Sequence, residues 1–127
     1  MSQENSRQFS AALSEEFEAV RLRYLDTMET TIIELDALLG AIGRPDVQER
    51  ALEGIRFRAH KISGTAETFG YPRMGQLAHQ VETAVDQRAR LSASGPTKQI
   101  EALVETLLVE MEQTLDARVY APQAARV

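Results

Sequence analysis

The sequence contains no cysteine and no tryptophan among its 127 residues, and only four prolines and seven glycines. Without cysteine the protein has no disulfide and no thiolate chemistry, which fits a reducing cytoplasm. The shortage of proline and glycine argues against a β-sandwich, which needs many turns. The length suits one hydrophobic core, so we expect a single domain over residues 1–127, with a core of about 14–119 and flexible ends.

Long apolar runs and an excess of positive charge are also missing. No run approaches the roughly 20 apolar residues of a membrane span, and the N-terminal residues do not form a signal peptide. The net charge of −5 disfavours nucleic acid as a partner. We therefore expect a cytoplasmic protein that binds neither membrane nor nucleic acid.

What the sequence does contain is apolar residues at helical spacing. They recur every three or four positions, the pattern of amphipathic helices, in four stretches: residues 17–42, 52–69, 74–85 and 100–115. Ser14 is a predicted N-cap, so a short extra helix carrying Phe9 and Leu13 is expected before the first long one. Four helices with short connections predict an all-α fold, an antiparallel up-down four-helix bundle.

Both histidines of the chain, His60 and His79, fall on the polar sides of predicted helices. Ala59 belongs to the core stripe, so His60 lies beside the core rather than in it. The positions that share its helix face carry no large apolar side chain: Glu53, Arg56, Ser63, Gly64 and Glu67. A buried histidine is usually structural, whereas an exposed one beside small residues is available to a partner.

Glycine inside a helix, as at Gly64, costs about 1 kcal/mol relative to alanine. Two explanations remain open for Gly64. It lets a neighbouring helix of the same protein pack closely, or it lets another protein surface approach.

The next helix carries a matching polar face, formed by Gly75, Gln76, His79, Glu82 and Asp86. The turn near Gly70 lies about ten residues after His60 and about nine before His79. At about 1.5 Å per residue, an antiparallel hairpin therefore brings the two histidines level. The spacing predicts a cluster of His60, His79 and Glu82.

Such a cluster suits phosphoryl chemistry. A carboxylate that accepts a hydrogen bond from one imidazole nitrogen leaves the other nitrogen as a nucleophile. The sequence has no glycine-rich phosphate loop, no Walker-type lysine and no acidic pair for Mg²⁺, so a partner must supply the catalytic metal site. Zinc binding is the weaker alternative, because no helix carries a Glu-x-x-His or His-x-x-x-His pair. Its ligands would be His60, His79, Glu67 and Glu82.

The segment from Arg58 to Glu82, RAHKISGTAETFGYPRMGQLAHQVE, resembles the core of histidine phosphotransfer (HPt) domains of two-component signalling. It is especially similar to the phosphotransfer domain of chemotaxis histidine kinases. That family has the phosphorylated histidine in Ala-His-x-Leu/Ile, then Lys-Gly and small residues, then Phe-Gly. The residues that fit are His60, Ile62, Gly64, Phe69 and Gly70, with His79 and Glu82 at the positions of a flanking histidine and glutamate.

The resemblance implies a phosphocarrier rather than an enzyme. His60 would accept a phosphoryl group on Nε2 from a histidine kinase, a hybrid kinase or a receiver aspartate, and exchange it with the aspartate of a response-regulator receiver domain. Glu82 would hold Nδ1–H, and His79 would complete the network. The domain would need no cofactor of its own, since the receiver would bring Mg²⁺. We expect a monomer, and the absence of a following domain favours a complete small protein over an excised kinase domain.

The chain departs from the family at Ser63, where the family usually has lysine. Arg56, one turn before His60, becomes the candidate to neutralise phosphoryl charge, and Lys61 is a second although it points about 100° away. Arg56 and Lys61 could equally be solvated surface charges that take no part in phosphoryl transfer. Ser63 and Gly64 would belong to the docking face. Two alternatives stay open: a degenerate module that binds receivers without carrying phosphate, and a helical adaptor or metal binder in which His60 is incidental.

Overall fold

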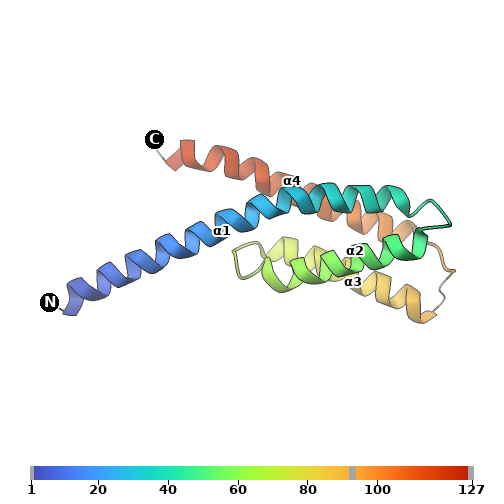
Figure 1. Cartoon of the computed structure of the whole chain (residues 1–127), viewed down its shortest axis with the longest axis horizontal. Helices are drawn as coiled ribbons and strands as arrows, with labels where there is room; N and C mark the ends of the chain where they lie inside the picture. Colours follow the sequence, from blue (N-terminus) through green and yellow to red (C-terminus); the bar gives the residue numbers. More distant parts are fainter. Residues whose placement is uncertain (1, 92–93, 126–127) are drawn as a thin grey trace.

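The computed structural model describes residues 2–91 and 94–125, and the side chains of residues 3–91 and 94–118. It contains the helices α1 (Ser2–Ala41), α2 (Gln48–Thr65), α3 (Pro72–Leu91) and α4 (Lys98–Ala125). Each helix packs against two others, in the order α1–α2, α2–α3, α3–α4 and α4–α1. The four therefore form a ring around a shared core (Figure 1), and the predicted antiparallel four-helix bundle is confirmed.

The core is built from the apolar stripes of the four helices. The residues at its centre are almost fully buried: Leu25, Leu35, Ile42, Ile55, Met74, Val81, Val104, Leu107 and Met111. Burying side chains of this size stabilises the fold by about 1.5–3 kcal/mol each. Within the described residues, no helix is long and apolar enough to cross a membrane.

The α2–α3 turn is set by Gly70 and Pro72. Gly70 has φ of +93°, a conformation that side-chain-bearing residues rarely adopt. The backbone N–H of Tyr71 donates to the carbonyl of Ala66 at 2.8 Å and closes the turn. Pro72 then occupies the first position of α3, where its missing N–H leaves no helical hydrogen bond unmade. These residues place α2 and α3 as an antiparallel hairpin.

The opposite end of the bundle is held by Arg88, whose side chain is buried. Its Nε donates to the carbonyl of Gly95 at 2.9 Å, and its Nη1 donates to Glu49 at 3.1 Å. This residue ties the connection before α4 to the start of α2. Residues 92–93 of the predicted loop 92–96 lie outside the described residues.

The separate helix predicted before Ser14 is not present, because α1 is continuous from Ser2 to Ala41. A serine inside a helix costs only tenths of a kcal/mol, whereas starting a new helix requires a costly nucleus. Phe17 and Val20, at the start of the predicted apolar stretch of residues 17–42, are exposed and are not part of the core. The N-terminal part of α1 extends past the bundle (Figure 1), and we call residues 2–20 the arm. At the other terminus α4 continues to Ala125, and the flexibility expected of the two ends stays a prediction.

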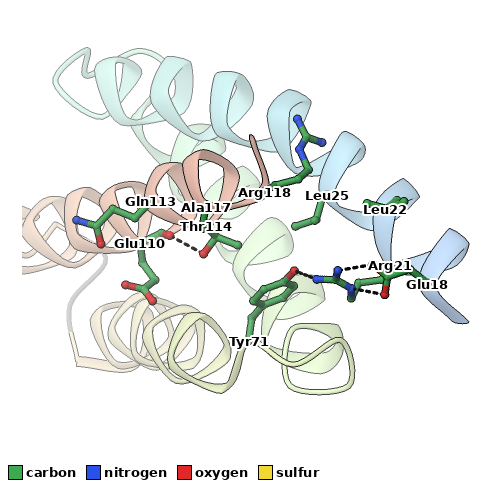
Figure 2. A pocket seen from close by; sticks show the side chains of 10 residues that line it. All are labelled: Glu18, Arg21, Leu22, Leu25, Tyr71, Glu110, Gln113, Thr114, Ala117 and Arg118. Carbon is green, nitrogen blue, oxygen red and sulfur yellow. Dashed lines mark hydrogen bonds and ion pairs between the residues drawn. The ribbon is translucent and has the colours of Figure 1, made fainter. Parts of the chain in front are cut away.

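Both termini lie at the same end of the bundle, where α1 and α4 diverge (Figure 1). The divergence leaves a cleft of about 620 Å³ between α1, Tyr71 and α4 (Figure 2). At its edge Arg21 donates from Nη1 to the Tyr71 hydroxyl at 2.7 Å and is paired with Glu18. The hydrogen bond that Arg21 donates to the Glu18 carboxylate raises the pKa of Arg21 above its usual value. Arg21 thus links the base of the arm to the α2–α3 turn.

Candidate functional site

His60 lies on the exposed face of α2, and Glu82 of α3 is its partner. Nδ1 of His60 is 2.5 Å from Oε2 of Glu82. The imidazole side chain is 69% exposed and the carboxylate only 14%. Nε2 carries no hydrogen bond to any residue that the structure describes. A covered carboxylate therefore holds one ring nitrogen and leaves the other open to a reactant.

Close packing of α2 on α3 makes this contact reachable. Ala59 and Ala78, next to the site on the two helices, are fully buried, so small side chains fill the interface. Gly75 is also buried, and a Cβ there would lie 3.6 Å from Cβ of Ala66. The sequence interpretation put Gly75 on the polar face, which is wrong. A Cβ at this position would be in ordinary van der Waals contact with the end of α2, so Gly75 lies in the α2–α3 interface.

Arg56 lies one turn before His60 and is paired with Asp86, one turn beyond Glu82. Nε of Arg56 donates to Oδ1 of Asp86 at 2.6 Å. This hydrogen bond, and then the charge of Asp86, raise the pKa of Arg56 above its usual value, and Glu82 adds to the effect. The sequence placed both residues near His60 but did not predict that they pair. A fully charged guanidinium is thereby held on the histidine face.

Three further predicted residues lie on α2 with different surroundings. Ser63 donates its hydroxyl to the carbonyl of His60 at 2.8 Å, so it is turned onto its own helix. Lys61 has its ammonium 5.4 Å from the ring centroid of Phe57, a cation–π contact rather than a contact with His60. A Cβ at Gly64 would meet nothing within 4 Å. Close packing by a neighbouring helix is therefore not the reason for Gly64.

His79 is on α3 as predicted, and its side chain is exposed. Within the described residues it makes no hydrogen bond to His60 or Glu82. It lines a shallow surface depression with Ser63, Glu67 and Gly75. The described part of the chain holds no group of three or more His, Cys, Asp or Glu side chains that could bind a metal ion. The role of His79 in the phosphoryl network stays a prediction.

Sequence reasoning missed Phe57. Its side chain is 56% exposed on α2, three residues before His60. The sequence could have identified Phe57 as an exposed apolar side chain, because it is a large apolar residue outside the core stripe of its helix. Phe57, His60 and Gly64 follow one another at helical spacing and form a row on the surface. An apolar group, a reactive group and an open position are thus aligned.

A four-helix bundle that presents an exposed histidine, held by a carboxylate of the next helix, has the features of a phosphocarrier. The family model for the Hpt domain matches residues 19–118, and the chain belongs to this family. The predicted family is confirmed. Comparisons with curated proteins and with solved structures found no match. Hpt domains carry phosphoryl groups on histidine in phosphorelays, interact with kinases and receiver domains, and lack kinase catalytic machinery.

Proposed function

We propose that His60 is the phosphorylated residue and that it exchanges its phosphoryl group with the aspartate of a response-regulator receiver domain. The observation that carries the proposal is the bond between Nδ1 of His60 and the covered carboxylate of Glu82, with Nε2 unpaired on an exposed imidazole. The other histidine, His79, has no such partner among the described residues. The donor to His60 is a histidine kinase, a hybrid kinase or a receiver.

The transfer from a receiver proceeds by in-line attack. The lone pair of Nε2 attacks the phosphorus of the aspartyl phosphate, a P–N bond forms, and the P–O bond to the aspartate breaks. The proton on Nδ1 stays on the ring, which becomes a phosphorylated imidazolium. Glu82 accepts the hydrogen bond from Nδ1–H and stabilises that positive charge. Mg²⁺ bound to the receiver neutralises phosphoryl charge, so this chain contributes the nucleophile and its orientation.

Arg56 is proposed to supply the positive charge that the family usually takes from the lysine replaced here by Ser63. Asp86 holds Nε of Arg56 and leaves the terminal nitrogens of the guanidinium for a phosphoryl oxygen, with Glu53 no closer than 3.9 Å to Nη1. The pair thus keeps the Arg56 guanidinium one helical turn before His60, on the same side of α2.

Replacing Arg56 with glutamine is therefore expected to slow phosphoryl transfer about threefold to tenfold, because one charge contact to the transferring group is lost. Single-turnover transfer from a phosphorylated receiver measures the rate. Arg50→Gln is the matched control, since Arg50 is an exposed arginine at the start of the same helix. Equal rates for the two variants would show that Arg56 is a surface charge only.

The docking face is proposed to run along the row of Phe57, His60 and Gly64. Phe57 offers exposed apolar area, which binding interfaces bury. Gly64 offers open space one turn past the histidine, where the receiver surface must come within bonding distance. The chemistry requires such an approach, because Nε2 has to reach the phosphorus.

Gly64→Ala tests this docking face, because the substitution is expected to slow phosphoryl transfer without lowering the stability of the fold. The added methyl meets no atom of this protein and lowers the entropy of the unfolded chain, so the free energy of unfolding is expected to stay equal or rise by up to about 1 kcal/mol. The same methyl is expected to slow transfer by keeping the receiver farther away. Urea unfolding and transfer kinetics provide the two measurements. A destabilised protein, or an unchanged transfer rate, would count against the open position being used for docking.

A second candidate is an Hpt-like module that binds receivers without carrying phosphate. The observation that favours it is Ser63, whose hydroxyl is turned to the carbonyl of His60 and carries no charge toward the site. Incubation with a phosphorylated receiver separates the two functions. Acid-labile, base-stable label on this chain supports the phosphocarrier, whereas binding without label supports the module.

A further inference from the structure

The ammonium of Lys61, the residue after His60, is a positive charge that no described carboxylate binds. The two arginines of this part of α2 are both paired: Arg56 and Arg58 bind carboxylates of the neighbouring helices at 2.6 Å and 2.7 Å. Lys61 makes no ion pair within the described residues, and its ammonium lies 5.4 Å from the ring centroid of Phe57. Lys61 can therefore offer an unmatched charge to an incoming anion.

Phe57 stands between Lys61 and His60 on the surface of α2. At about 100° per residue, Lys61 lies about 40° from Phe57 on one side and His60 about 60° on the other, both about one turn further along the helix. An ammonium over the Phe57 ring is therefore turned toward the His60 side of its own position. Further rotation about the bonds of the lysine side chain moves it past the ring toward Nε2.

We propose that Lys61 is a second cation for the phosphoryl group, held on Phe57 in the free protein and moved to a phosphoryl oxygen when that group reaches Nε2. The inference rests on the proposed function, with His60 as the acceptor and Phe57 in the docking face. Lys61 takes no part in bond making. The phosphorus passes from the aspartate oxygen to Nε2 as before, and the ammonium keeps its protons and acts through its charge.

Docking of the receiver favours this movement. The Phe57 ring is 56% exposed, and a receiver that covers it also covers the ammonium above it. An ammonium enclosed against an apolar surface loses its water, and a buried charge without a paired anion is strongly unfavourable. Glu34, which lines the same groove as Lys61, is already held by Arg58 at 2.7 Å. The phosphoryl group is thus the anion that lacks a partner on this chain.

Arg56 and Lys61 then flank the phosphoryl group from two sides. Arg56 lies about 40° from His60 around the helix, toward α3, where Asp86 binds it. Lys61 lies about 100° from His60 in the other direction, toward α1, with which it lines a groove. Positive charge on both sides stabilises the transferring group more than either cation alone.

Single-turnover transfer from a phosphorylated receiver tests the charge of Lys61. At saturating receiver, Lys61→Gln is expected to lower the transfer rate about threefold to tenfold, and Lys61→Arg is expected to restore most of it, because the cation acts on the transferring group. Lys98→Gln is the matched control, since Lys98 is the other lysine of the chain and is exposed at the start of α4. Equal rates for Lys61→Gln and Lys98→Gln overturn the proposal.

NMR of the full chain with isotope-labelled lysine tests the movement, and its two lysines give two sets of side-chain signals. In the free protein the Cε–Hε signal of Lys61 is expected to be shifted by the ring current of Phe57, and Phe57→Leu should remove that shift. Phosphoramidate then phosphorylates His60 in a His79→Gln background, where it is the single histidine. The Lys61 signal is expected to lose its ring-current shift while the Lys98 signal stays in place. A Lys61 signal that phosphorylation leaves unchanged overturns the proposal.

These two experiments separate the role of Lys61 from the assignment of His60. Phosphoramidate reacts with an imidazole chemically and needs no receiver, so the NMR result holds whether or not a receiver labels His60. Normal labelling of His60 by a receiver, together with equal rates for Lys61→Gln and Lys98→Gln, would retain the phosphocarrier and reject Lys61 as its second cation.

Discussion

Replacement of His60 with glutamine is expected to abolish uptake of phosphate from a phosphorylated receiver. The substitution removes the nucleophilic nitrogen, and no other described histidine is held by a carboxylate. The fold should survive, because the His60 side chain is largely exposed and contributes nothing to the core. Radiolabel transfer measures the loss, and thermal unfolding confirms that the variant is folded.

His79→Gln is the matched control, since it removes the other histidine of the chain from the neighbouring helix. We expect this variant to remain labelled. If the label persists on His60→Gln and disappears from His79→Gln, the phosphorylated residue is His79 and not His60. The comparison also tests the prediction that His79 assists, through a reduced but measurable rate.

Glu82→Gln is expected to slow transfer by about tenfold to a hundredfold while leaving the amount of label at saturation unchanged. Glutamine has nearly the same shape and still accepts a hydrogen bond from Nδ1–H, but it lacks the negative charge that stabilises the phosphorylated imidazolium. The substitution is therefore expected to change the rate of transfer, while His60 remains the residue that accepts the phosphoryl group. Single-turnover kinetics at fixed receiver concentration measure it.

Glu67→Gln serves as the control for Glu82. Glu67 is an exposed acidic residue just after α2 and forms no ion pair with His60. Its substitution is expected to leave the rate within about twofold of the native protein, since an exposed charge acts weakly through water. If the two glutamine variants transfer at the same rate, the hydrogen bond to Nδ1 does not assist the chemistry.

The histidine pair could be predicted because it depends on local rules. Apolar periodicity marks α2 and α3, and Gly70 with Pro72 marks the reversal between them. Two antiparallel helices with a known turn fix which residues lie level. The contact of His60 with Glu82 follows from that arithmetic, and the structure shows it at 2.5 Å.

Other features could not be predicted because they depend on packing between helices. Whether Gly75 faces solvent or a neighbouring backbone is decided by the rotation of α3 against α2, which periodicity defines only to within one residue. The pairing of Arg56 with Asp86 is a choice among several long side chains that reach the same surface. The sequence alone does not show which of the neighbouring acidic side chains Arg56 pairs with.

The arm shows a different limit. The sequence places Phe9 and Leu13 on a helix and Phe17 in the apolar stretch of residues 17–42, but all three side chains are exposed. A stripe shows that a helix face needs a partner, and it does not show whether that partner belongs to the same chain. Phe9 and Leu13 are exposed and belong to the arm, which extends past the bundle (Figure 1).

The most direct measurement is phosphorus NMR of the native protein after incubation with a phosphorylated receiver, combined with peptide mapping of the label. The account predicts a single phosphoramidate on Nε2 of His60, labile in acid and stable in base. A phosphoramidate on Nδ1, label at His79, or label that is stable in acid would contradict it.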